Sequence, residues 1–136
     1  MRLLCLCLLL GVAQLHAQQE TPFQTWQTDK GGHVLTLFVN FAAGAPLKAA
    51  SIGEAVITKD NQGFVTMQVP LSNPSGGRKA AKIKWDWKKT NGMAVRSPLG
   101  NTLRLITIPG KDKTVIQSVS STPNPQSVTL TIYPAK

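Results

Sequence analysis

The side chains that could perform acid or base chemistry in this chain are few and far apart. Glycoside hydrolysis by two carboxylates requires the pair to face each other across the scissile bond. Asp60 and Asp112 lie among turn residues, where Asp side chains usually cap backbone amides. Asp86 lies between Lys84 and Lys88, and we expect it to pair with a cation on a neighbouring strand. A glycan-processing or other hydrolytic enzyme is the alternative function, and it requires carboxylates that converge only in three dimensions.

The chain lacks the residues for a metal site or for nucleophilic catalysis. Cys5 and Cys7 lie in an apolar N-terminal segment, and His33 is the one histidine beyond that segment. A zinc site normally draws on several His, Cys or carboxylate ligands. No serine stands in a Gly-x-Ser-x-Gly context, and no glycine-rich phosphate loop precedes a helix. We therefore expect a non-enzymatic protein with no catalytic residue, no metal and no cofactor.

The densest concentration of charge is a basic segment in the middle of the chain. Alternation in a strand puts Lys82, Lys84 and Lys88 on one exposed face, and such a stripe could follow a polyanion. Nucleic acid is a less favoured partner, because its readers expose aromatic residues for base stacking and the aromatic residues here alternate onto the other face. A lysine-rich face that only keeps the protein soluble and its edges unpaired is the competing interpretation. The candidate contacts for an anionic partner, which could be an envelope protein or a polyanion, are Arg78, Lys79, Lys82, Lys84, Lys88 and Lys89.

These lysines belong to the clearest strand of the sequence, residues 80–89. Ile83, Trp85 and Trp87 alternate with the charged residues and fall on the opposite face. A lone strand cannot bury two indole rings, so neighbouring segments must supply an opposing sheet. We therefore expect both tryptophans in the core of a layered β structure.

Short alternating segments separated by turn residues account for most of the remaining chain. Asp60-Asn61-Gln62-Gly63 and Asn91-Gly92 are hairpin signals, and no segment has the spacing of an amphipathic helix. This pattern predicts an all-β protein, an immunoglobulin-like antiparallel β-sandwich of about seven strands. Besides residues 80–89, strands are expected at 34–41, 54–59, 64–71, 93–96, 103–108, 114–119 and 127–133.

The N-terminal segment has the features of a secretory signal peptide. Arg2 precedes an apolar run at residues 3–12, which is too short to span a bilayer, and Leu15-His16-Ala17 suits signal peptidase. We expect a signal peptide at 1–17, a flexible leader at 18–32 and a single β-sandwich domain at 33–136. A retained membrane anchor is the alternative to cleavage. No later stretch is apolar enough to span a membrane.

Cleavage would remove both cysteines, and it would leave fourteen basic against six acidic residues. An exported domain without disulfides fits the periplasm or cell envelope of a bacterium better than a eukaryotic secreted module. The basic excess favours association with anionic surfaces, or else serves solubility.

The second half of the chain resembles the YcfL-like family of small periplasmic or outer-membrane lipoprotein domains of Gram-negative bacteria. The resemblance lies in four motifs: V-P-L-S-N at 69–73, I-K-W-D-W-K-K-T-N-G-M-A-V at 83–95, L-R-L-I-T-I-P-G at 103–110 and V-T-L-T-I-Y at 128–133. It implies an immunoglobulin-like β-sandwich in the cell envelope, and it offers no catalytic residues to carry over. The chain departs from the family in having no cysteine after its apolar run, so the resemblance does not imply a lipid anchor.

Overall fold

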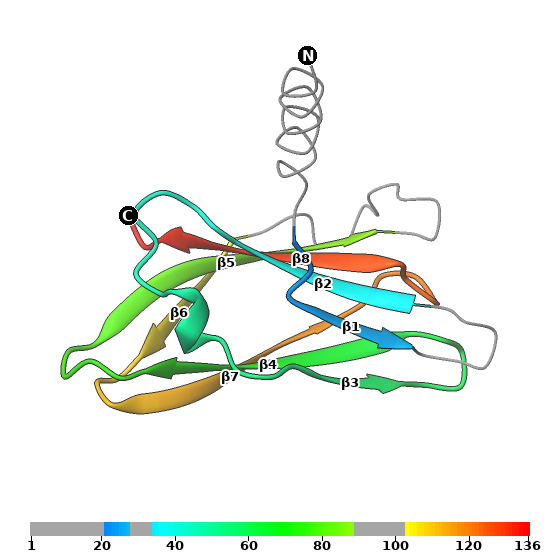
Figure 1. The fold of residues 1–136 in the computed structure, drawn as a ribbon, viewed down its shortest axis with the longest axis horizontal. Coiled ribbons are helices and arrows are strands. Elements are labelled where there is room, and N and C mark those ends of the chain that lie inside the picture. The colour runs from blue at the N-terminus through cyan, green and yellow to red at the C-terminus, as the bar shows by residue number, and fades with distance from the viewer. Residues whose placement is uncertain (1–20, 28–33, 89–102) are drawn as a thin grey trace, which may run out of the picture.

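The computed structural model describes residues 21–27, 34–88 and 103–136, and β-strands are their predominant regular structure (Figure 1). The signal peptide, the Asn91-Gly92 turn and the strand expected at 93–96 lie outside the described residues. The elements are β1 (Gln24–Gln27), β2 (Val34–Phe41), a short 3-10 helix η1 (Ala49–Ser51), β3 (Val56–Lys59), β4 (Val65–Asn73), β5 (Lys79–Lys88), β6 (Arg104–Ile108), β7 (Asp112–Val119) and β8 (Ser127–Pro134).

The strands form two sheets that stack as the layers of a sandwich, as Figure 1 shows. One sheet has the order β1-β2-β8-β5-β6, and the other has the order β3-β4-β7. The predicted all-β sandwich is therefore confirmed. It differs from the expectation in one pairing, because β2 and β8 run parallel while the other strand pairs are antiparallel. Local hydrophobic patterns do not specify which distant strands become neighbours.

The strand that carries the lysines, β5, lies inside the larger sheet between β8 and β6. Its alternation appears as predicted, with Ala81, Ile83 and Trp87 buried. Trp87 is only 5 % exposed, and its Nε1 donates a hydrogen bond of 2.9 Å to Ser118 Oγ on β7 in the other sheet. Trp85 is partly buried and packs against the core. The core placement of the two tryptophans is thus confirmed, fully for Trp87 and in part for Trp85.

The core fills the space between the two sheets. Core residues of the same strand stand at alternate positions, as the pleat of a half-buried strand requires. The larger sheet supplies Leu35, Leu37, Ala81, Ile83, Trp87, Ile108, Val128, Leu130 and Ile132, and the smaller sheet supplies Val65, Met67, Val69, Leu71 and Ile116.

The segment expected as a flexible leader contains β1, which is a correction to the sequence analysis. Residues Gln24–Gln27 pair antiparallel with β2, and Trp26 packs against the core. The Gln24 side chain acts as a backbone would, because its Nε2 donates to Ala55 O and its Oε1 accepts from Ala55 N, both at 2.9 Å. This side chain fastens the edge of the larger sheet to the entrance of β3. Three of its four residues are polar, so the strand has no clear hydrophobic alternation, and the contact of Gln24 with Ala55 spans 31 positions of the sequence.

Candidate functional site

The predicted lysine stripe exists on the outer face of β5, and we call Lys82, Lys84 and Lys88 the strand face. Their register partners on β8 are Tyr133, Thr131 and Ser127, which share that face because directly opposed residues point to the same side of a sheet. The three lysines are each partly exposed, and the residue across from each of them on β8 carries a hydroxyl group. The strand face therefore offers cations flanked by neutral hydrogen-bonding groups.

Asp86 is the acid within this face, and its pairing corrects an expectation. Its Oδ2 lies 4.0 Å from Lys84 Nζ on the same strand, whereas its register partner on β8 is Thr129. Among the residues that the structure describes, Asp86 therefore pairs along its own strand and not across to a neighbouring one. Two-residue spacing within β5 already brings the two side chains to one face. The Lys84 and Asp86 side chains are 27 % and 30 % exposed, and a contact this long between such charges is weak.

Aromatic residues from neighbouring strands share the outer face with the lysines, which the sequence analysis missed. Tyr133 on β8 lies directly across from Lys82, and Phe38 on β2 lies across from Thr129. Both rings are partly exposed. The expectation that the aromatic residues turn inward holds for β5 itself, but the face is built by several strands. Phe38 alternates with the buried Leu35 and Leu37 along β2, and this alternation could have placed its ring on the outer face.

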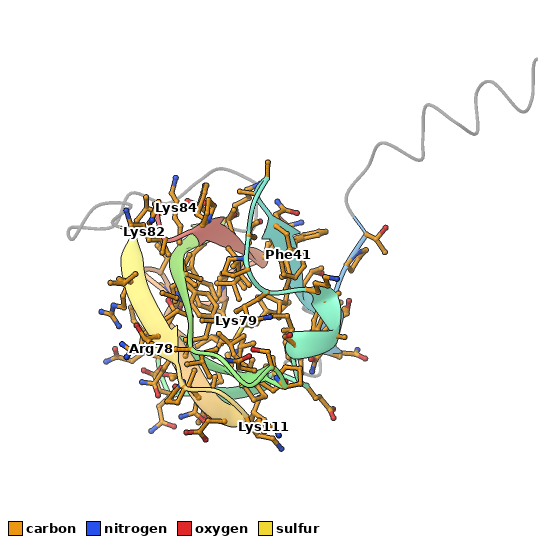
Figure 2. All side chains as sticks on the ribbon, turned by 90° about the vertical axis from the view of Figure 1, so that its left-hand side faces the viewer. Phe41, Arg78, Lys79, Lys82, Lys84 and Lys111 are labelled. Carbon is orange, nitrogen blue, oxygen red and sulfur yellow. The ribbon has the colours of Figure 1, made fainter. Side chains whose placement is uncertain are left out.

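The other predicted contact residues do not lie on the strand face. Arg78 precedes β5 and is exposed, and Lys79 has the inward orientation of Ala81. Lys79 borders a shallow hollow that has no room for a water-sized sphere. Figure 2 views the end of the sandwich at which β5 begins, and it shows Lys79 near the middle and Arg78 to one side. Lys89 lies outside the described residues. The hollow is lined by Leu47, Lys79, Ala81, Ile106 and Ile108.

The carboxylates of the two turns have the capping role that the sequence predicted. Asp60 Oδ1 accepts hydrogen bonds of 2.9 Å from the backbone N–H groups of Gln62 and Phe64. Asp112 Oδ1 accepts from the Lys113 N–H at 2.7 Å. Asp60 precedes β4 and Asp112 pairs with its last residue, so the nine-residue strand separates them by about 26 Å. This pair cannot face a single glycosidic bond.

Within residues 21–27, 34–88 and 103–136, no three His, Cys, Asp or Glu side chains gather as metal ligands would. The same ranges contain no helix of the length and hydropathy that a membrane span needs.

Comparison with known proteins bears on the fold. No protein-family model and no curated protein matches the chain. The fold is similar to the crystal structure of Campylobacter jejuni cj0090, with a TM-score of 0.57 at 19% identity over 69% of this chain and 94% of that one. It is also similar to a DUF1425 family member from Shewanella sp. pv-4, with a TM-score of 0.54 at 16% identity over 62% of this chain and 77% of that one. At these identities, the likeness shows a shared fold.

Proposed function

We propose that this protein is an exported, non-enzymatic module of the bacterial cell envelope that binds an anionic partner through the strand face. The observation that carries the proposal is the placement of Lys82, Lys84 and Lys88 on one side of a central strand, with Asp86 as the acid of β5 on that side. Cations held in a row on a rigid sheet bind a polyanion with less loss of conformational freedom than cations on a loose segment.

The residues around the strand face add hydrogen-bonding groups and an aromatic ring to its charge, and both suit a binding surface. Hydroxyl groups of Ser127 and Thr131 can donate to anionic oxygens, and the Tyr133 ring adds a flat contact surface. A face that serves solubility alone needs charge but has no need of an aromatic residue beside Lys82.

The exported location rests on the sequence, through the signal peptide at 1–17 and the absence of later cysteines. The YcfL-like resemblance points to the same compartment. The fold shared with proteins from Campylobacter and Shewanella is consistent with a bacterial source.

The test is retention on anionic envelope material at low and at high salt. We expect the parent to bind at low salt and to be released as salt rises, because contacts with a polyanion weaken as counterions compete. A variant with Lys82, Lys84 and Lys88 all changed to Glu should melt like the parent and should not be retained. Equal, salt-independent retention of both proteins would overturn the proposal.

A further inference from the structure

One end of the sandwich gathers cations that the strand face does not use, and we call Arg78, Lys79 and Lys111 the basic end. They come from three places in the fold: the β4–β5 connection, the first residue of β5 and the β6–β7 turn. Figure 2 looks onto this end and shows Lys79 near its middle, with Arg78 to its left and Lys111 below it.

The two loops of the basic end are fastened to each other. Lys111 N–H donates to Ser75 O at 2.8 Å, and a Cβ on Gly110 would come within 2.3 Å of Gly76 O. The backbones therefore touch, and only a glycine fits at position 110. The buried Asn73 adds a second connection, because its Nδ2 lies 2.8 Å from Gly77 O and 3.1 Å from Pro109 O. The backbones of the two loops that carry Arg78 and Lys111 are thus held together.

The charge of the basic end is not neutralised within the described chain. None of Arg78, Lys79 and Lys111 forms an ion pair with any residue that the structure describes. The nearest acid in sequence is Asp112, which adjoins Lys111 but forms no ion pair with it; its Oδ1 accepts the Lys113 N–H. Unpaired cations on a fixed framework are available for an external anion.

The backbone at Lys111 also points to a function at this end. Its φ is 57°, in the left-handed region that favours glycine or asparagine. A lysine at such a position is strained, and strained residues cluster at functional sites. The strained conformation sets a long cationic side chain at the tip of the turn.

From these observations we propose that the basic end docks on a membrane surface that contains anionic phospholipids. The cations come from two loops and the start of a strand and are spread over the end of the sandwich (Figure 2), so a plane of head groups can contact them together. The adjacent hollow is too small to admit even water, which disfavours a pocket for one small anion. This inference rests on the proposed function, because it names the anionic partner and adds a second contact surface to the strand face.

The experiment measures binding of the parent protein to vesicles of phosphatidylcholine alone and of phosphatidylcholine with phosphatidylglycerol in equal parts. We expect binding only to the anionic vesicles. The double variant R78Q/K111G should bind them about thirtyfold more weakly, since each basic residue near an anionic bilayer strengthens binding about fivefold. Thermal melting shows whether each variant is folded.

The control is the variant K59Q/R104Q, which loses one lysine and one arginine elsewhere. Lys59 ends β3 beside the start of β4, and Arg104 lies opposite Ile83, four residues along β5 from Lys79. Its vesicle binding should stay within about threefold of the parent, since exposed charges beyond a Debye length are largely screened. Equal losses in both double variants would show a response to net charge alone and would overturn the proposal.

Two further outcomes separate this inference from the proposed function. If the parent ignores anionic vesicles but binds soluble dextran sulfate through the strand face, the membrane proposal fails and the proposed function stands. If the parent binds neither anionic vesicles, nor dextran sulfate, nor envelope material, both the membrane proposal and the proposed function fail.

Discussion

Asn73 Nδ2 donates a hydrogen bond of 3.1 Å to the carbonyl oxygen of Ile108, and this contact joins the two sheets at the basic end. Asn73 ends β4 in the smaller sheet, while Ile108 ends β6 in the larger one. The amide is 1 % exposed, and its Oδ1 accepts from the N–H and hydroxyl of Ser75. One buried side chain therefore organises both loops that carry Arg78 and Lys111.

Replacing Asn73 with alanine should lower the free energy of unfolding by about 2–3 kcal/mol, because buried carbonyls lose their donors. Asn73→Asp keeps the shape and the acceptor but directs a carboxylate at carbonyl oxygens, so it should destabilise at least as much. Urea denaturation of both variants measures the effect. An Asn73→Asp protein with the midpoint of the parent would show that the donors at this position contribute nothing.

Trp87 and Trp85 should differ in their contribution to stability. Trp87→Ala empties a buried site and should cost about 3–5 kcal/mol, while Trp85→Ala should cost less because Trp85 is partly exposed. Trp87→Phe keeps a ring but loses the hydrogen bond to Ser118, at a cost of about 0.5–1.5 kcal/mol beyond the loss of packing. A larger loss of unfolding free energy for Trp85→Ala than for Trp87→Ala would contradict the deeper burial of Trp87.

Lys111→Gly should stabilise the fold, although it removes a charged side chain. A left-handed conformation costs an L-residue roughly 1–2 kcal/mol, and the extra freedom of glycine in the unfolded chain offsets about 0.5–1 kcal/mol of the gain. Lys113→Gly is the matched control, because Lys113 lies within β7 and glycine weakens a strand. Thermal melting should move up for the first variant and down for the second, and a fall for both would contradict the strain at Lys111.

The exported protein should begin at Gln18 and carry no lipid. The expectation follows from the Leu15-His16-Ala17 ending and from the position of both cysteines ahead of it. Intact-mass measurement of the exported protein checks both points at once. A mass that includes the first seventeen residues, or an added acyl group, would disprove cleavage without lipidation.

Much of the fold could be predicted because alternation is a local signal. The Lys79–Lys88 strand shows the clearest alternation, and its buried and exposed sides were predicted correctly. Gln24–Gln27 was missed because three of its four residues are polar and because Ala55, the partner of the Gln24 side chain, lies 31 positions along the chain. The parallel pairing of β2 with β8 was missed because hydrophobic period does not encode neighbours.

The candidate site was predicted only where it follows a single strand. Lys82, Lys84 and Lys88 share a face because of their spacing, which the sequence contains. Arg78 and Lys79 do not share that face, because Arg78 precedes β5 and Lys79 points to the other side of the strand. Lys111 comes near them through the contact between the β4–β5 and β6–β7 loops. The sequence analysis grouped Arg78 and Lys79 with the strand face because they are close to it in sequence. It missed Lys111 because that residue is distant in sequence.

The most direct test of the proposed function compares two triple variants that carry the same net charge. One changes Lys82, Lys84 and Lys88 to Glu on the strand face. The other changes Lys48, Lys59 and Lys113 to Glu on other parts of the sandwich. Retention on anionic envelope material at low salt should be lost in the first and largely kept in the second, with both folded by thermal melting. Equal retention of the two variants would contradict a specific role for the strand face.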